Sequence, residues 1–287
     1  MPGSESIDGL FAEIDMMDRV DSYELGMSSL DSFIGLSNVK EQIKNLVNNS
    51  ELKKCPHLLF VGPPGSGKTA VANALMRIYY GLRIINDQIL KEVCQKDLIS
   101  PYIGQTAYNT KEAIEQSLGG ILYIDNAHDL FNDNQQDYFA NEAIVELLNG
   151  MENHRDDLVV ILAGLEEPLM KHINENPSFA YRFRNIIRFD NYSDEELIRL
   201  FKKACEGKKY TYSQEGLDVL KQIIILEKSR VKEECFTNAR FLKNLFDDIL
   251  MQQAVRLSDV PNLDKDKLLT LEKEDFLAVL NRMKAAK

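Results

Sequence analysis

Residues 62–69, GPPGSGKT, constrain the fold of this 287-residue chain more than any other feature of its sequence. The segment matches G-x-x-x-x-G-K-[ST] and stands between an apolar stretch, HLLFV, and a helical one, AVANALMRIYY. In a strand–loop–helix of this kind, backbone N–H groups and the positive end of the helix surround phosphate groups. A glycine-rich turn with a chance lysine would match the pattern but not its setting. The sequence therefore predicts a phosphate-binding P-loop.

A second motif supplies a metal ligand. Asp125 ends the apolar stretch ILYI, 56 residues after Thr69, and P-loop enzymes carry a carboxylate at this point of a second strand. Many strands end in Asp, so the position after the P-loop is what favours the metal role. We expect Lys68 to reach the β- and γ-phosphates, and Thr69 and Asp125 to hold Mg²⁺. The predicted ligands are ATP and Mg²⁺, with the nucleotide bound by Gly62, Pro63, Pro64, Gly65, Ser66, Gly67, Lys68 and Thr69.

The apolar pattern predicts an α/β core. Three short continuous runs, 57–61, 120–124 and 158–163, have the length of buried parallel strands. Helical patterns lie between them at 70–80, 107–116 and 140–151, and strand–helix alternation is typical of a central parallel sheet.

The pattern changes near residue 190. Ser193-Asp194-Glu195-Glu196 resembles a capping box, and only helical periodicity follows, at 197–204, 215–227, 239–257 and 272–283. We therefore expect three parts. These are an acidic leader (1–29) with a short amphipathic helix around 7–17, an α/β nucleotide-binding core (30–190) and an all-helical domain (191–287).

Composition excludes several function classes. The 34 Lys and Arg against 45 Asp and Glu give 34 − 45 = −11, which argues against nucleic-acid or anionic-membrane partners. The sequence contains no run of about 18 apolar residues, and its acidic start is unlike a secretory signal. Four cysteines, at 55, 94, 205 and 235, form neither C-x-x-C pairs nor a metal-ligand pattern. We expect reduced thiols in a cytoplasmic or equivalent compartment.

Between about Leu30 and Leu257 the sequence resembles AAA+ ATPases of the CbbX and stage V sporulation protein K group, which includes the red-type rubisco activases. The resemblance rests on LDSFIGLSNVKEQI, the P-loop, DLISPYIGQTAYNTKEAI, GGILYIDNAHDLF, MENHRDDLVVILAG, NPSFAYRFRNIIRFDNYSDEEL and FTNARFLKNLFDDILMQQA. It implies a P-loop AAA+ core followed by a small all-helical lid, ATPase activity, chaperone-like remodelling of a protein substrate, and a hexameric ring.

The resemblance also implies individual roles. Ile34 and Gly35 would lie against the adenine. Tyr102, Ile103 and Gly104 match the pore loop that grips a polypeptide, although Pro101 precedes them where a polar residue is expected. Arg182 matches the arginine finger that reaches a neighbouring subunit, with Arg184 two residues on as the other candidate. Arg240 matches the second sensor. No first sensor can be named, because LVVILAG runs into Leu165-Glu166.

The main departure from the family is Asn126, where AAA+ proteins carry the glutamate that polarises the attacking water. The amide of asparagine cannot take up a proton, and the asparagine side chain is one methylene shorter than that of glutamate. We therefore expect hydrolysis to be slowed while Mg·ATP binding remains. His128 and Asp129 are the candidate substitutes, although both fall past the end of the predicted strand. Three explanations stay open: an introduced substitution that traps ATP, a degenerate subunit that works beside active ones, and an ATP-gated switch with little turnover.

Three functions follow from these features. The first is a motor in which pore loops pull on a partner protein, and the pore-loop tripeptide favours it. The second is a nucleotide-gated scaffold or regulatory subunit, which Asn126 favours. The third, a nucleic-acid AAA+ protein, is disfavoured by the acidic charge and by the absence of a recognition module after Leu257.

Overall fold

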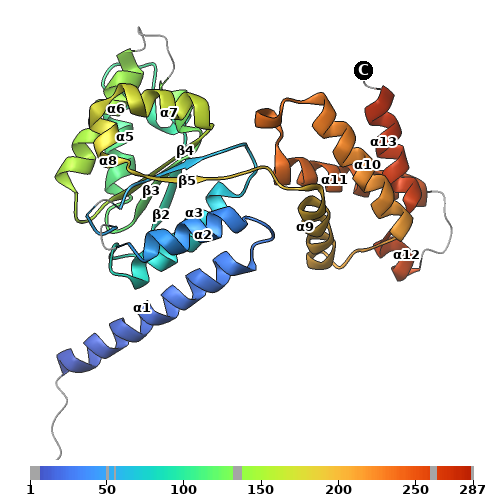
Figure 1. The fold of residues 1–287 in the computed structure, drawn as a ribbon, viewed down its shortest axis with the longest axis horizontal. Coiled ribbons are helices and arrows are strands. Elements are labelled where there is room, and N and C mark those ends of the chain that lie inside the picture. The colour runs from blue at the N-terminus through green and yellow to red at the C-terminus, as the bar shows by residue number, and fades with distance from the viewer. Residues whose placement is uncertain (1–6, 50–51, 55, 132–137, 259–263, 286–287) are drawn as a thin grey trace, which may run out of the picture. The chain divides into compact units, whose positions relative to one another are not determined.

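The computed structural model describes residues 7–49, 52–54, 56–131, 138–258 and 264–285 (Figure 1). The chain forms two compact units. One comprises residues 1–33, 37–62 and 67–189, and the other comprises residues 34–36, 63–66 and 190–287, in so far as these are described. The second unit thus consists mainly of the chain from Asp190 onward.

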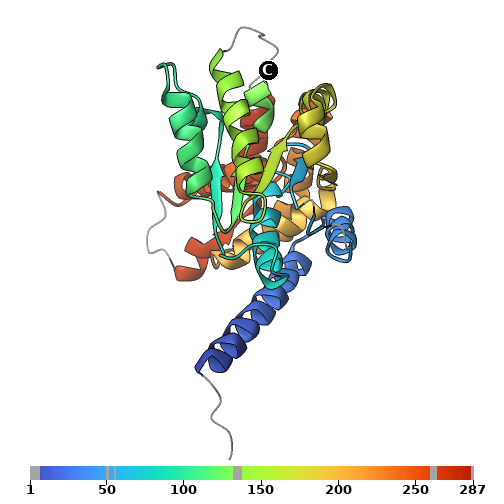
Figure 2. The ribbon, with the colours of Figure 1, turned by 90° about the vertical axis from the view of Figure 1, so that its left-hand side faces the viewer.

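The first unit is built on a five-stranded sheet in which every neighbouring pair is parallel (Figure 2). The strands are β1 (Leu58–Val61), β2 (Leu90–Val93), β3 (Ile121–Ile124), β4 (Val159–Gly164) and β5 (Asn185–Arg188), in the order β2-β3-β4-β1-β5. The predicted α/β fold with a central parallel sheet is confirmed. Strands β1, β3 and β4 are buried along their whole length, which is why their sequences are continuously apolar.

Helices cover both faces of this sheet. They are α2 (Ser37–Val47), α3 (Lys68–Gly81), α4 (Gln95–Leu98), α5 (Gln105–Glu115), α6 (Tyr138–Asn153), α7 (Glu166–Glu175) and α8 (Pro177–Arg182), with a short 3₁₀ turn, η1 (Ala127–Phe131). One core joins alternate residues of the strands, such as Leu122 and Leu162, to α5, α6, α7, α8 and η1. Helix α3 lies on the opposite face (Figure 1).

The N-terminal helix is longer than the sequence predicted. Instead of a short helix around 7–17 in an acidic leader, α1 runs from Ile7 to Ser32, and residues 1–6 lie outside the described residues. Its length follows from packing on α3. The guanidinium of Arg19 donates to Tyr80 O at 2.9 Å, and the Ser22 hydroxyl donates to Arg77 O at 3.1 Å. Leu30 is fully buried.

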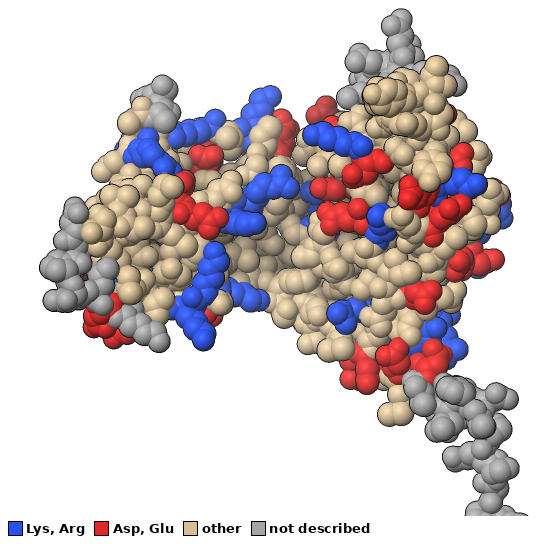
Figure 3. Space-filling view, turned by 180° about the vertical axis from the view of Figure 1, so that it is seen from behind, with Lys and Arg blue, Asp and Glu red and all other residues tan. Residues whose placement is uncertain are grey.

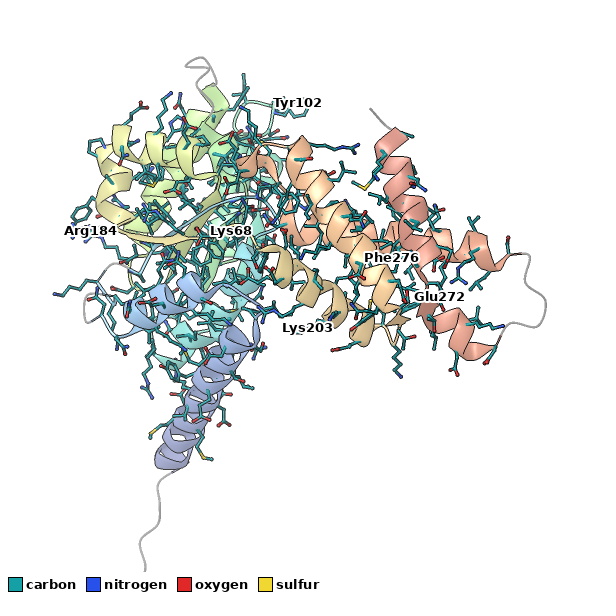
Figure 4. All side chains as sticks on the ribbon, turned by 45° about the vertical axis from the view of Figure 1, so that its right-hand side comes forward. Lys68, Tyr102, Arg184, Lys203, Glu272 and Phe276 are labelled. Atoms are coloured by element: carbon teal, nitrogen blue, oxygen red, sulfur yellow. The ribbon has the colours of Figure 1, made fainter. Side chains whose placement is uncertain are left out.

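The second unit is helical, as expected for a lid. Its elements are α9 (Asp194–Gly207), α10 (Gln214–Arg230), η2 (Glu233–Cys235), α11 (Asn238–Leu257), α12 (Lys265–Leu269) and α13 (Lys273–Ala285). The capping box at Ser193 and Glu196 is present at the start of α9. Phe276, labelled in Figure 4, is buried against Phe201 with ring centroids 5.7 Å apart.

The lid also contains a parallel strand pair that the helical periodicity did not predict. Strands β6 (Thr211–Tyr212) and β7 (Thr270–Leu271) are two residues each, too short for an alternating pattern to be visible in the sequence.

On the face in Figure 3, acidic and basic side chains are interspersed. In the part of the chain that the structure describes, no helix combines the length and apolarity needed to cross a membrane.

Candidate functional site

The P-loop joins the end of β1 to the start of α3. Gly67 has φ 99°, a left-handed conformation that favours glycine, and directly precedes the first residue of the helix. Lys68 is almost fully buried, and its Nζ donates to Gly62 O at 2.9 Å. Gly62 N–H in turn donates to Gly164 O at the end of β4, at 3.0 Å. The loop is therefore anchored to two adjacent strands, and its ammonium group is bonded to the loop's own first residue (Lys68 is labelled in Figure 4).

Thr69 and Asp125 are both neighbours of the Tyr123 phenol, whose pKa each of them affects. The Thr69 hydroxyl donates to Tyr123 Oη at 3.3 Å, and Asp125 directly follows β3, two residues after Tyr123. The Asp125 N–H donates to Val93 O at 2.8 Å. Hydroxyl and carboxylate oxygens are the ligands that Mg²⁺ prefers, so Thr69 and Asp125 fit this ion, and Lys68 fits the phosphates.

Tyr123 is a site neighbour that sequence reasoning missed. It is fully buried, and burial raises the pKa of its phenol above the usual range, so the hydroxyl stays protonated. The signal was available in the spacing of residues 123 and 125, because alternate residues of an extended chain point to the same side.

Asn126 directly follows Asp125 in a left-handed conformation, φ 50°, and its side chain is exposed. Asparagine adopts this region more readily than most residues. Its amide Nδ2 donates to Asp125 Oδ2 at 3.3 Å, so the amide supports the carboxylate. The amide oxygen is not a base. The slowed hydrolysis that we expect from the sequence therefore concerns a side chain that is exposed to solvent.

The two residues considered as substitutes, His128 and Asp129, both lie in η1. Nε2 of His128 is 3.8 Å from Asp129 Oδ1, and the Asp129 side chain is half exposed. The backbone N–H of Asp129 donates to Asn126 O at 2.9 Å. These contacts place both residues beside the turn that carries Asn126.

The tip of the P-loop, residues 63–66, belongs to the helical unit together with residues 34–36. Gly65 O accepts the Ala239 N–H at 3.1 Å, and Arg240 follows in the first turn of α11 with an exposed side chain. Gly35 lies against the carboxylate of Glu196. Ile34 is part of the same unit and is partly buried.

Asn238 is a second residue that sequence reasoning missed. It is fully buried, with φ 47°. Its Nδ2 donates to Asn191 Oδ1 at 2.7 Å and to Pro64 O at 3.2 Å, while its Oδ1 accepts the Tyr192 N–H at 3.0 Å. The side-chain amide of Asn238, at the start of α11, thus connects the tip of the P-loop to Asn191 and Tyr192. Its place two residues before Arg240, in TNAR, was the hint that the sequence offered.

The candidate pore loop is exposed and braced. Tyr102 is 67% exposed and Ile103 is 91% exposed, between α4 and α5 (Figure 4). Ser100 and Thr106 close the base of the loop, because Ser100 N–H donates to Thr106 Oγ1 at 3.0 Å and Thr106 Oγ1 donates to Ser100 O at 3.1 Å. Gly104, with φ 79°, directly precedes α5. Large apolar side chains on a fixed loop suit contact with another chain.

Arg182 and Arg184 lie in different surroundings at the end of α8. Arg182 Nη2 is 2.7 Å from Glu152 Oε2, and its Nη1 donates to Ser178 O at 3.0 Å. Arg184 is exposed, and its guanidinium lies over the Tyr181 ring at 4.6 Å from the centroid (Figure 4). Arg184 Nε also donates to Tyr181 O at 3.1 Å, so the two guanidinium groups differ in that Arg182 has a carboxylate partner.

Comparison with known proteins agrees with this architecture. The family model "ATPase family associated with various cellular activities (AAA)" matches residues 58–191, and the "AAA lid domain" model matches residues 193–286. The chain is 38% identical to a protein CfxQ homolog of Galdieria sulphuraria, over 85% of this chain and 84% of that one. It is 37% identical to protein CbbX of Cereibacter sphaeroides, over 85% and 83%.

A third relative is the chloroplastic ribulose bisphosphate carboxylase/oxygenase activase of Cyanidioschyzon merolae, 36% identical over 85% of this chain and 87% of that one. The chain therefore belongs to the AAA ATPase family, within the group of CfxQ, CbbX and this rubisco activase.

Solved structures share the fold at low sequence identity. The AAA domain of FIGL-1 in complex with ADP matches with a TM-score of 0.60 and 15% identity, over 87% of this chain and 82% of that one. A RuvB variant of Thermotoga maritima matches with a TM-score of 0.56 and 19% identity, over 89% and 72%. At these identities the likeness is one of fold.

Proposed function

We propose that this protein binds Mg·ATP, assembles into a hexameric ring and remodels or threads a partner protein through its pore loops. Lys68 would bind the β- and γ-phosphates, Thr69 and Asp125 would hold the ion, and Arg240 would contact the nucleotide from the lid. Bound Mg²⁺ would neutralise charge on the phosphates. The related rubisco activase is named for an action on another protein, and we propose an action of this kind for the present chain. No residue identifies the partner protein.

The exposed pore loop is the observation that carries the proposal. Tyr102 and Ile103 present apolar surface on a loop that Ser100 and Thr106 hold in place. A monomer gains nothing from such exposure, whereas a ring would bring several copies of the loop together around a substrate.

A second candidate function is a nucleotide-gated scaffold with little turnover. Asn126 favours it, because its amide cannot accept the proton of the attacking water. In this alternative the chain binds Mg·ATP and assembles, either alone or with active AAA+ subunits. ATP turnover separates the two candidates, and the pore loop is dispensable in the second.

We expect a photocrosslinking amino acid at position 102 to capture a partner protein in the presence of ATP. Tyr181 is a matched control, because its side chain is equally exposed, at 67%, but lies on α8 next to Arg182. The control should crosslink to a neighbouring copy of this chain. Mass spectrometry of the products distinguishes the two outcomes, and crosslinks from position 102 that reach only copies of the chain would count against threading.

We expect assembly to depend on ATP and on Arg182. A guanidinium that reaches a neighbour's γ-phosphate contributes to that subunit's site, so Arg182→Ala should weaken the ATP-dependent assembly measured by light scattering. In an Asn126→Glu background the same change should lower turnover by about a thousandfold, the lower end of what arginine fingers contribute.

Arg184→Ala is the control for this prediction, because Arg184 lies two residues away and stacks on Tyr181 instead. Assembly and turnover that survive Arg182→Ala but not Arg184→Ala would transfer the finger to Arg184. A monomer at saturating ATP and high concentration would contradict the ring.

A further inference from the structure

Strand β4 carries no polar side chain at its carboxyl end. At the same end of the sheet, β1 leads into the P-loop and β3 leads into Asp125. The last residue of β4 is Gly164, and Leu165 follows. The imidazole of His128 lies over this end instead, since the Leu165 N–H donates to its Nδ1 at 3.4 Å. A Cβ atom on Gly164 would stand 2.6 Å from the same nitrogen. The imidazole thus takes the space that a β4 side chain would need.

We infer that His128 contacts the terminal phosphate of bound ATP, from the turn after β3, in place of a side chain at the end of β4. The inference rests on the proposed ATP binding. It names a phosphate-contacting residue that the sequence did not, because His128 precedes Gly164 by 36 residues and only the fold joins them.

A continuous set of contacts links His128 to the P-loop. Gly164, under the imidazole, accepts the N–H of Gly62 at 3.0 Å, and Gly62 O accepts Lys68 Nζ at 2.9 Å. Because β4 lies between β3 and β1, the turn after β3 and the loop after β1 flank the same strand end. Ligands of parallel sheets bind at the carboxyl ends of the strands, so a phosphate bound by Lys68 lies on the side where His128 stands.

The state of the imidazole defines its chemistry. Nδ1 accepts a hydrogen bond, so the neutral ring carries its proton on Nε2. Burial lowers the pKa of His128 from its usual value and the charge of Lys68 lowers it too, against the opposing effects of Asp129 and Asp125. Near pH 7 the ring is therefore a neutral donor. A donor suits a phosphate oxygen, and it does not replace the base that Asn126 lacks.

The test compares affinity for ATP with affinity for ADP, using fluorescent analogues in the presence of Mg²⁺. His128→Phe keeps a planar ring but removes the donor, so ATP should bind about tenfold to a hundredfold more weakly. ADP affinity should not change, because ADP lacks the phosphate concerned. His128→Gln keeps an N–H near the position of Nε2 and should stay within about threefold of the wild-type ratio.

A paired substitution tests the geometry without relying on one variant. Gly164→Asn alone should lower the melting temperature, because its Cβ meets the imidazole. His128→Ala with Gly164→Asn removes that clash and places an amide donor on β4, so both the stability and the preference for ATP should recover.

A wild-type ATP/ADP ratio in His128→Phe would overturn the inference. So would a double variant that folds and binds ADP but does not recover the preference for ATP, and this variant decides the matter if His128→Phe does not fold. If the wild-type chain binds neither nucleotide, the proposed function fails instead, which distinguishes the two failures.

Discussion

Replacing Asn126 by glutamate is expected to raise ATP turnover by about a hundredfold to ten-thousandfold, the range that a general base contributes. In the wild-type chain an attacking water would be poorly polarised, because an amide oxygen is a weaker acceptor than a carboxylate and takes up no proton. The loss concerns the transition state, so the affinity for Mg·ATP should stay nearly constant. Turnover is measured by phosphate release, and ATP-stabilised assembly should become shorter-lived.

The control for this experiment is Asp125→Asn, which should impair Mg²⁺-dependent binding because it removes a metal ligand. Glutamate is less readily accommodated than asparagine at φ 50°, so Asn126→Glu should lower the free energy of unfolding by about 1 kcal/mol. A thermal melt separates this cost from the gain in activity. If the wild-type chain already hydrolyses ATP as fast as Asn126→Glu, another residue acts on the water, and Asp129 is then the first candidate.

Lys68→Ala is expected to abolish measurable ATP binding. The ammonium is almost fully buried inside the loop that follows β1, and it is the principal cation for the β- and γ-phosphates. Loss of a charge-assisted contact to two phosphates should lower affinity by at least about a hundredfold. Titration of a fluorescent ATP analogue measures the effect.

The alanine variant also loses the bond from Lys68 Nζ to Gly62 O, so a structural effect must be separated from a binding effect. Lys68→Met keeps the length and apolar volume of the side chain while it removes the charge, and it should bind ATP as poorly as Lys68→Ala. Circular dichroism should show a folded protein in both. An affinity equal to wild type in either folded variant would refute the nucleotide site.

Much of the α/β core could be predicted because its signals are local. The loop GPPGSGKT, the runs HLLFV and GILYI, and Asp125 stand in their diagnostic order within short stretches of chain. Strands that are buried on both faces must be apolar throughout, which made β1, β3 and β4 visible. The edge strands β2 and β5 were missed, since Lys91, Glu92 and Arg188 interrupt the apolar pattern where solvent is accessible.

The sequence by itself also determined that position 126 carries an amide, that a candidate pore loop follows residue 100, and that a helical domain follows residue 190. These properties depend on residue type and on order along the chain. The tertiary structure decided which residues meet. It extended α1 by packing it on α3, set Tyr123 beside Thr69, and placed His128 over Gly164 at the end of β4. Such contacts join residues that are tens of positions apart in the sequence. They form because the register of the parallel strands brings the carboxyl ends of β1, β3 and β4 to the same end of the sheet.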